Sequence, residues 1–214
     1  MVKKSTMTLF SYLYLFVSLI LAITFHECSH AYVASVLGDP TAKLKGRVSL
    51  NPIRHLDLVG TIMIIMTFVS GFGIGWGKPV PVNPYNFRDY KKGEALTALA
   101  GPMANFLLAL VASFFIRFLG DSLSLYFINF LQVFVMLNVG LMSFNLIPVP
   151  PLDGSKILFM FLPDRYYHLR ARLEHNGAMI LFGAIIVSQI LGIPLLQWIL
   201  GPIMNFTFFL LGVS

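Results

Sequence analysis

The chain has 214 residues and a formal net charge of +6, with 57% hydrophobic residues, only 11% charged residues and a mean hydropathy of +0.80. This balance excludes an ordinary soluble globular domain and predicts a membrane protein. A single cysteine, Cys28, excludes an internal disulfide framework and a cysteine-based zinc site. The positive charge lies in short segments between apolar runs, as in loops that face an anionic membrane surface, so no nucleic-acid partner is expected.

Five or six segments are long and apolar enough to enter a bilayer, since a span needs about 20 residues. In chain order they cover residues 8–37, 57–75, 94–119, 125–147, 177–193 and 195–212. The first follows Lys3 and Lys4 like the start of a signal peptide, but no small-residue cleavage site comes after it, so a retained helix is expected. The sequence predicts an all-α polytopic membrane protein.

The same segments suggest a single membrane-embedded domain over residues 1–214. Its core is expected at 8–155, and the two helices within 177–212 are expected to be accessory. Gly192 and Pro194 separate these last two helices and favour a tight helical hairpin.

The basic residues gather in three groups, within residues 43–54, 78–92 and 156–172. The positive-inside tendency would place all three in the cytoplasm, which requires segment 57–75 to enter and leave on the same side as a re-entrant hairpin. Glycines in this segment are compatible with irregular backbone at membrane depth. An ordinary crossing at 57–75, with the N-terminus inside, is the alternative, and charge alone does not decide between them.

Residues 26–30 read His-Glu-Cys-Ser-His, an HExxH pattern inside an apolar stretch. On a helix, His26 and His30 share one face and can bind one Zn²⁺, while Glu27 can reach a metal-bound water as general base. The pattern is short and arises by chance in soluble chains. An ionisable residue at membrane depth, however, costs at least about 2.5 kcal/mol, which favours a metal site here.

A third ligand is required, and Asp153 is the best candidate. It follows the fourth apolar segment, after three prolines that break the helix, and Gly154 frees the backbone behind it. A solvated loop residue or a helix cap is the alternative interpretation of Asp153. His30 adjoins the first basic loop and Asp153 the third, so a shared metal requires both loops on one side, as the re-entrant topology provides.

With these motifs in place, the chain resembles the site-2 protease family of intramembrane zinc metalloproteases. The HExxH at residues 26–30 and the Asn-x-x-Pro-x-x-Pro-x-Asp-Gly element at 145–154 carry the resemblance, with further matches at 51–55, 75–84 and 100–105. The matches run in order over residues 20–155. The resemblance is to compact bacterial-type members, and neither a PDZ nor a CBS domain is expected.

The resemblance implies a three-helix core around one Zn²⁺ per chain, with His26, His30 and Asp153 as ligands and Glu27 as general base. It implies an endopeptidase that cuts transmembrane proteins or peptides within the lipid bilayer. The expected location is a bacterial cell membrane, with the active site towards the cytoplasm. The physiological substrate and the oligomeric state stay open.

Asn145 and His55 are the candidate supporting residues. Asn145 either hydrogen-bonds the oxyanion or substrate backbone, or caps its helix. His55 is either a partner or proton donor near the zinc, or an interfacial histidine in a basic loop. Residues 71–83, with alternating glycines followed by prolines, are expected to form an extended edge that takes the substrate as an added strand, with a flexible turn as the alternative. Residues 101–105 are expected to serve helix packing. Asn105 is a candidate for a hydrogen bond across the bundle, and no catalytic role is expected for it.

Two other functions compete with proteolysis. A metal transporter or metal-binding membrane protein would also place histidine and carboxylate in the bilayer. A pseudoprotease scaffold would bind transmembrane helices without cutting them. The first gives no reason for Glu27 between the two histidines, and the second gives none for an intact HExxH with Asp153.

Overall fold

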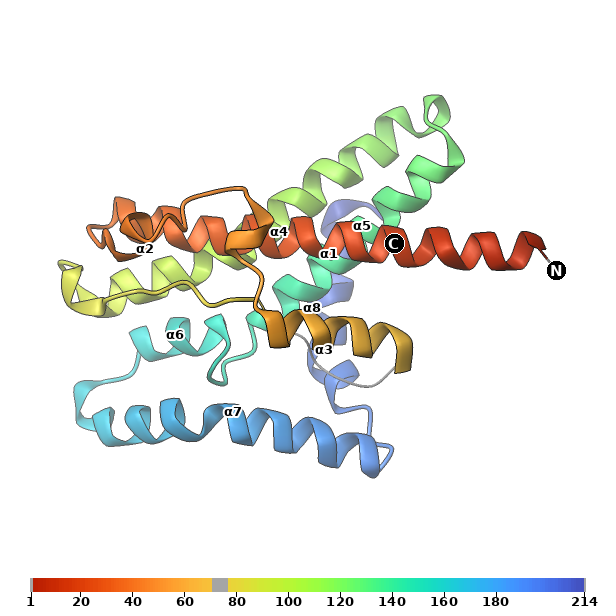
Figure 1. Cartoon of the computed structure of the whole chain (residues 1–214). Helices are drawn as coiled ribbons and strands as arrows, with labels where there is room; N and C mark the ends of the chain where they lie inside the picture. The colour runs from red at the N-terminus through yellow and green to blue at the C-terminus, as the bar shows by residue number, and fades with distance from the viewer. Residues whose placement is uncertain (1, 71–76, 214) are drawn as a thin grey trace.

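The structure is a computed structural model that describes residues 2–70 and 77–213. Its regular elements in these ranges are helices, as the all-α prediction expects (Figure 1). The longer helices are α1 (Val2–Val36), α4 (Tyr90–Leu119), α5 (Leu125–Asn145), α7 (Tyr167–Ile190) and α8 (Leu195–Leu211). The shorter elements are α2 (Thr41–Leu44), α3 (Leu58–Ser70), α6 (Asp153–Met160) and 3-10 turns at Pro52–Arg54, Pro84–Asn86, Gly120–Ser122 and Asp164–Tyr166.

Among the described residues, four helical stretches are long and apolar enough to cross a membrane: Phe10–Val36, Tyr90–Ser122, Leu125–Asn145 and Asp164–Ile190. Helix α8 is apolar but shorter, with 17 residues. The chain is therefore an integral membrane protein. Helix α7 begins at Tyr167 rather than at the predicted residue 177, because charged side chains in its first turns form ion pairs instead of lying in a solvated loop.

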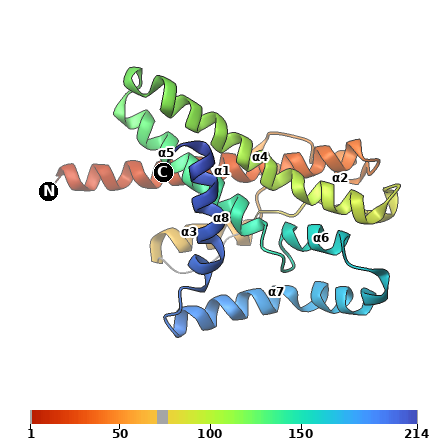
Figure 2. The same ribbon diagram turned by 180° about the vertical axis from the view of Figure 1, so that it is seen from behind.

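Helices α1, α4 and α5 pack against one another and form the centre of the molecule (Figure 1). Small buried residues such as Ala109 and Ala112 allow α4 to approach its neighbours closely, which is how helices associate without a hydrophobic driving force in lipid. Helix α8 leaves the end of α7 and crosses α5 (Figure 2). Its Leu211 joins the same apolar cluster as Ala109 and Ala112, so α8 belongs to the packing of the core.

The residues that flank the segment after the first basic loop lie close together in space. Helix α3 has 13 residues, a length of about 20 Å against the roughly 30 Å of a hydrocarbon core. On either side of it, Leu56 and Gly77 form an isolated antiparallel bridge, and the Lys78 amide donates to the His55 carbonyl at 2.8 Å. The residues that flank the segment therefore lie side by side, which is what the re-entrant alternative predicts. Residues 71–76 of the segment lie outside the described ranges.

Candidate metal centre

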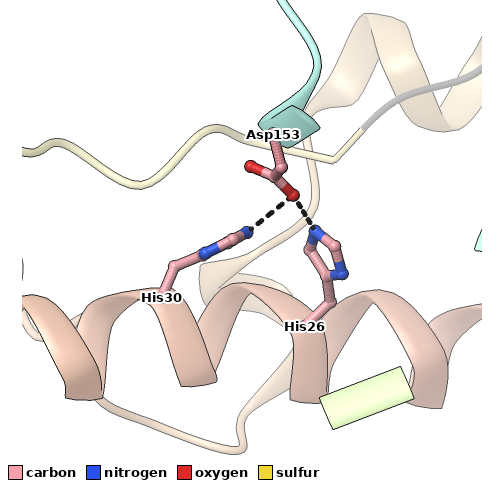
Figure 3. Close-up of side chains that lie close together, drawn as sticks. All are labelled: His26, His30 and Asp153. Atoms are coloured by element: carbon pink, nitrogen blue, oxygen red, sulfur yellow. Dashed lines mark ion pairs between the residues drawn. The ribbon is translucent and has the colours of Figure 1, made fainter. Parts of the chain in front are cut away.

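Two histidines project from one face of α1 towards a carboxylate of α6 (Figure 3). The side chains of His26 and His30 lie one helical turn apart, are buried, and have ring centroids 4.6 Å apart. The Nε2 atoms of His26 and His30 lie 3.2 and 3.3 Å from Asp153 Oδ2, respectively. The HExxH spacing thus produces the shared face that it predicts.

Asp153 is the first residue of α6 and reaches the histidines because of the turn that precedes it. Prolines end α5, and the next helix starts tightly against that end. A Cβ atom on Gly154 would lie only 2.2 Å from the Leu146 carbonyl oxygen, so only glycine allows this approach. The buried Asp153 Oδ2 has no hydrogen-bond donor among the described residues, and its carboxylate faces the two imidazoles.

The other nitrogen of each imidazole is held by α4. His26 Nδ1 donates to Asn105 Oδ1 at 3.0 Å, and His30 Nδ1 donates to the Thr97 carbonyl at 2.6 Å. Because a carbonyl oxygen can only accept, these bonds put a proton on Nδ1, and in the neutral imidazole Nε2 then carries the free lone pair. This tautomer is the one that a metal ion needs, and such partners orient the ligands of metal sites in general.

The three facing atoms are all electron-pair donors to a cation. Two Nε2 atoms and one carboxylate oxygen lie within 4.8 Å of one another, and each can donate an electron pair to a metal ion. Ligands at about 2.0–2.1 Å from a tetrahedral zinc lie roughly 3.3 Å from each other. The distances of 3.2 and 3.3 Å in this cluster agree with that spacing, so these residues could form a metal site that fits zinc.

Gly101 allows α4 to pack directly onto the two imidazoles. A Cβ atom at this position would lie 2.4 Å from His30 Nε2 and 2.6 Å from His26 Nε2. Gly101 and Asn105 are four residues apart on one helix and therefore share a face, which is the spacing that relates His26 to His30. That matching spacing is the signal by which the sequence could have assigned the 101–105 segment to the metal centre rather than to packing alone.

A cavity of about 760 Å³ lies beside the metal centre. Side chains of α1, α4, α5, α6 and α7 line it, together with the non-helical residues that follow Gly77. Glu27 lines the cavity next to His26, and Asn145 lines it from the end of α5. This volume lies within the range of ligand pockets. The lining is mostly apolar, and its polar groups include the two histidines, Glu27 and Asp153.

The structure treats the two predicted supporting residues differently. Asn145 reaches the cavity, while its Nδ2 atom donates to the Leu141 carbonyl at 2.9 Å. His55 is fully buried, and its Nε2 atom donates to the Ser49 carbonyl at 2.6 Å. In the part of the chain that the structure describes, His55 is not among the residues that line the cavity. Its imidazole instead braces the loop that carries it.

Arg47 also lies near the site, and the amino-acid sequence does not indicate this position. It belongs to a basic loop, yet it is buried, and its Nη2 atom lies 4.0 Å from Glu27 Oε2. Loop composition carries no sign of burial, so no local signal distinguishes Arg47 from the exposed basic residues beside it.

Comparison with known proteins agrees with this geometry. The family model of peptidase family M50 matches residues 14–188. The chain is 37% identical over 200 residues to "Putative zinc metalloprotease YwhC" of Bacillus subtilis, which covers 90% of this chain and 86% of the relative. It is 28% identical over 184 residues to "Zinc metalloprotease MJ0392" of Methanocaldococcus jannaschii, covering 83% of this chain and 44% of the relative. No solved structure matches significantly.

The family match covers most of the chain and includes the two histidines, the glutamate between them and the aspartate of α6. The similarity to the Bacillus subtilis relative extends over nearly the whole of both chains. The chain therefore belongs to peptidase family M50, the site-2 protease family, and is an intramembrane zinc metallopeptidase.

Proposed function

We propose that this peptidase binds one zinc ion through His26 Nε2, His30 Nε2 and Asp153, and that Glu27 is its general base. The convergence of three acceptor atoms at 3.2 and 3.3 Å is the observation that carries the proposal. Bound zinc supplies a Lewis acid and brings the pKa of a coordinated water towards about 7.

The protein's own residues divide the remaining work. Asn105 and the Thr97 carbonyl hold the two imidazoles in the ligand tautomer. Glu27 faces the cavity, takes a proton from the attacking water and passes it to the departing amine. Asn145 also faces the cavity, and its amide can donate to a developing oxyanion if it leaves the Leu141 carbonyl. We assign His55 the bracing of its loop through its bond to the Ser49 carbonyl, and its role as a partner or proton donor near the zinc stays a prediction.

The substrate is a transmembrane protein or peptide that lies in the cavity in extended form. Residues 78–83 belong to no helix, and the side chains of Pro79, Val80 and Val82 line the cavity. Pro79 and Pro81 have no amide proton, so Val80 and Val82 supply the amide donors of this stretch. Neither has a backbone hydrogen-bond partner within the described residues. Residues two apart on a strand present their backbone groups to the same edge, which suits strand addition by a substrate.

The active site lies towards the cytoplasm of a bacterial cell membrane in this proposal. The re-entrant segment brings the basic loops at both of its ends to one side of the membrane. Exposed lysines and arginines of these loops, such as Lys45, Arg54 and Arg88, are the type that the positive-inside tendency retains in the cytoplasm. We take the described helices as a single membrane-embedded domain, because α8 packs into the same cluster as α4 and α5.

Glu27→Gln tests the proposal against its rivals. The change is isosteric and leaves the three proposed ligands in place, so zinc content should stay at the parent level. Cleavage of a model transmembrane substrate in detergent should fall about 10²-fold to 10⁴-fold, the usual contribution of a general base. If the parent binds zinc but cuts no member of a broad substrate panel, the metal-transport or scaffold interpretation takes its place.

A further inference from the structure

Arg47 differs from the other basic residues of its loop. Only 6% of its surface is exposed, whereas Lys43, Lys45 and Arg54 are exposed. Burying a guanidinium group is unfavourable unless hydrogen bonds and an opposite charge compensate for the lost hydration. The residues that compensate Arg47 therefore indicate what this side chain is for.

The Arg47 guanidinium contacts two parts of the cavity at once. Its Nη1 and Nη2 atoms donate to the carbonyls of Pro79 at 3.1 Å and Lys78 at 2.5 Å. The same Nη2 lies 4.0 Å from Glu27 Oε2. One side chain thus joins the extended wall of the cavity to the residue that we propose as general base.

We infer that Arg47 is a positioning residue that fixes the position of the cavity wall, residues 78–82, relative to Glu27. The inference rests on the proposed function, in which an extended substrate lies along this wall. A peptide paired with Val80 and Val82 takes its position from the wall. The distance from its scissile carbonyl to Glu27 is then set by whatever fixes the wall to α1.

The chemistry of arginine suits this task better than that of lysine. A planar guanidinium presents several fixed N–H donors and can serve two successive carbonyls while still facing a carboxylate. A lysine ammonium keeps the charge near Glu27, but it is a single point of attachment on a flexible stem. Loss of the fork would let the wall shift, and a misplacement of about 1 Å can cost about 10²-fold in rate.

The test compares Arg47→Gln, Arg47→Lys and the control Arg54→Gln in the purified full chain. Arg54 lies in the same loop, is exposed, and donates to the Gly46 carbonyl away from the cavity. Zinc content and thermal midpoint are measured beside kcat and KM for a model transmembrane substrate. Arg47→Gln should keep zinc and lower kcat/KM about 10²-fold, with KM raised and kcat lowered. Arg47→Lys should recover part of kcat but little of KM, and Arg54→Gln should stay within about twofold of the parent, as surface changes do.

A binding readout separates positioning from general structural support. In the Glu27→Gln background, a photo-crosslinking residue at Val82 on the wall, or at Leu19 on α1, reports where the substrate lies; both positions line the cavity. Adding Arg47→Gln should reduce substrate crosslinking at Val82 about tenfold while crosslinking at Leu19 persists, in line with a displaced wall.

Three results would overturn the inference. Unchanged kcat/KM in Arg47→Gln would show that the wall needs no such anchor. Equal loss of crosslinking at Val82 and Leu19, together with loss of zinc, would make Arg47 a folding residue only. A parent protein that cleaves none of the substrates would instead refute the proposed function, and the inference would fall with it.

Discussion

Two groups of polar side chains lie near the start of α4 and α6, and they differ in whether their carboxylates are paired with cationic side chains. In the candidate metal centre, two imidazole nitrogens and a carboxylate oxygen converge, and no lysine or arginine lies among these three atoms. In the ion-pair cluster, by contrast, every carboxylate meets a cation. The members of that cluster are Glu94, Lys156, Arg170 and Glu174.

The distances show how completely the ion-pair cluster satisfies itself. Arg170 Nη2 lies 2.6 Å from Glu94 Oε2, and Lys156 Nζ lies 2.8 Å from Glu174 Oε1. This cluster needs nothing from outside and ties α7 to α4 and α6. Converging acceptors, on the other hand, are stable only when a cation joins them. A candidate ligand site is therefore marked by acceptor atoms that converge without a lysine or arginine partner, as they do at His26, His30 and Asp153.

Gly101→Ala should disrupt the metal centre most severely. The added Cβ atom would lie 2.4 Å from His30 Nε2, so the imidazoles or α4 must move. We expect loss of most of the bound zinc and a fall in kcat/KM of at least about 10²-fold. Gly140→Ala on α5 is the matched control, because no atom lies within 4 Å of its added Cβ. The zinc content of both variants is measured by metal analysis. A Gly101→Ala protein with full zinc content would contradict the close approach of α4.

Asn105→Ala should weaken zinc binding without abolishing it. The change removes the acceptor of His26 Nδ1 but leaves the Nε2 ligand in place. Loss of such a partner typically lowers metal affinity about 10-fold to 100-fold. Chelator competition would measure the effect. Asn138→Ala controls for removal of a buried amide, since Asn138 donates only to Phe134 of its own helix among the described residues. Equal zinc affinities in the two variants would remove Asn105 from the metal centre.

Arg170→Met should lower stability and leave zinc content unchanged. The substitution leaves the buried Glu94 carboxylate with Lys156 Nζ at 3.8 Å as its remaining ion-pair partner. Removing one member of a buried pair costs roughly 3 kcal/mol, which should appear as a lower thermal midpoint. Arg172→Met, at an exposed position of the same helix, should leave the midpoint near that of the parent. Loss of zinc in Arg170→Met would show that the two groups are not independent.

The smallest effect should be at Asp39, where the stability of the surrounding loop should depend on pH. Burial alone would raise the pKa of Asp39, but hydrogen bonds from Thr41, Asn83 and Asn86 outweigh it and hold the pKa below its ordinary value. A lowered folded-state pKa means that the stabilisation is complete above the ordinary aspartate pKa of about 3.9 and is lost as pH falls through the lower folded value. Protection of the Asn83 amide from hydrogen exchange should follow that course. Protection that does not change with pH would show that the carboxylate does not hold this loop.

The sequence could predict the proposed metal ligands because their signals are local or follow from membrane depth. His26 and His30 share a face by helical spacing, and Asp153 follows from a proline turn that must lie at the same depth. The re-entrant segment was one of two alternatives until the bridge between Leu56 and Gly77 brought its ends together.

The remaining features depend on tertiary contacts that no short pattern encodes. The sequence predicts a hydrogen bond across the bundle for Asn105 but not its partner, because the bond to His26 arises only when α4 lies on α1. Arg47 resembled its exposed neighbours because burial in a loop is decided by what packs over it. The sequence predicts a loop before residue 177 rather than the first turns of α7. The reason is that the partners of Arg170 lie partly in α4, far away in sequence.

The metal content of the purified chain tests whether His26, His30 and Asp153 bind zinc. Zinc is measured in the parent and in Asp153→Ala, with X-ray absorption to identify the ligand atoms in the parent. We predict one zinc per chain bound by two imidazoles and oxygen, and no retained zinc in Asp153→Ala. A parent that carries no zinc from zinc-replete growth, or an Asp153→Ala protein that retains it, would contradict the assignment of His26, His30 and Asp153 as the metal centre.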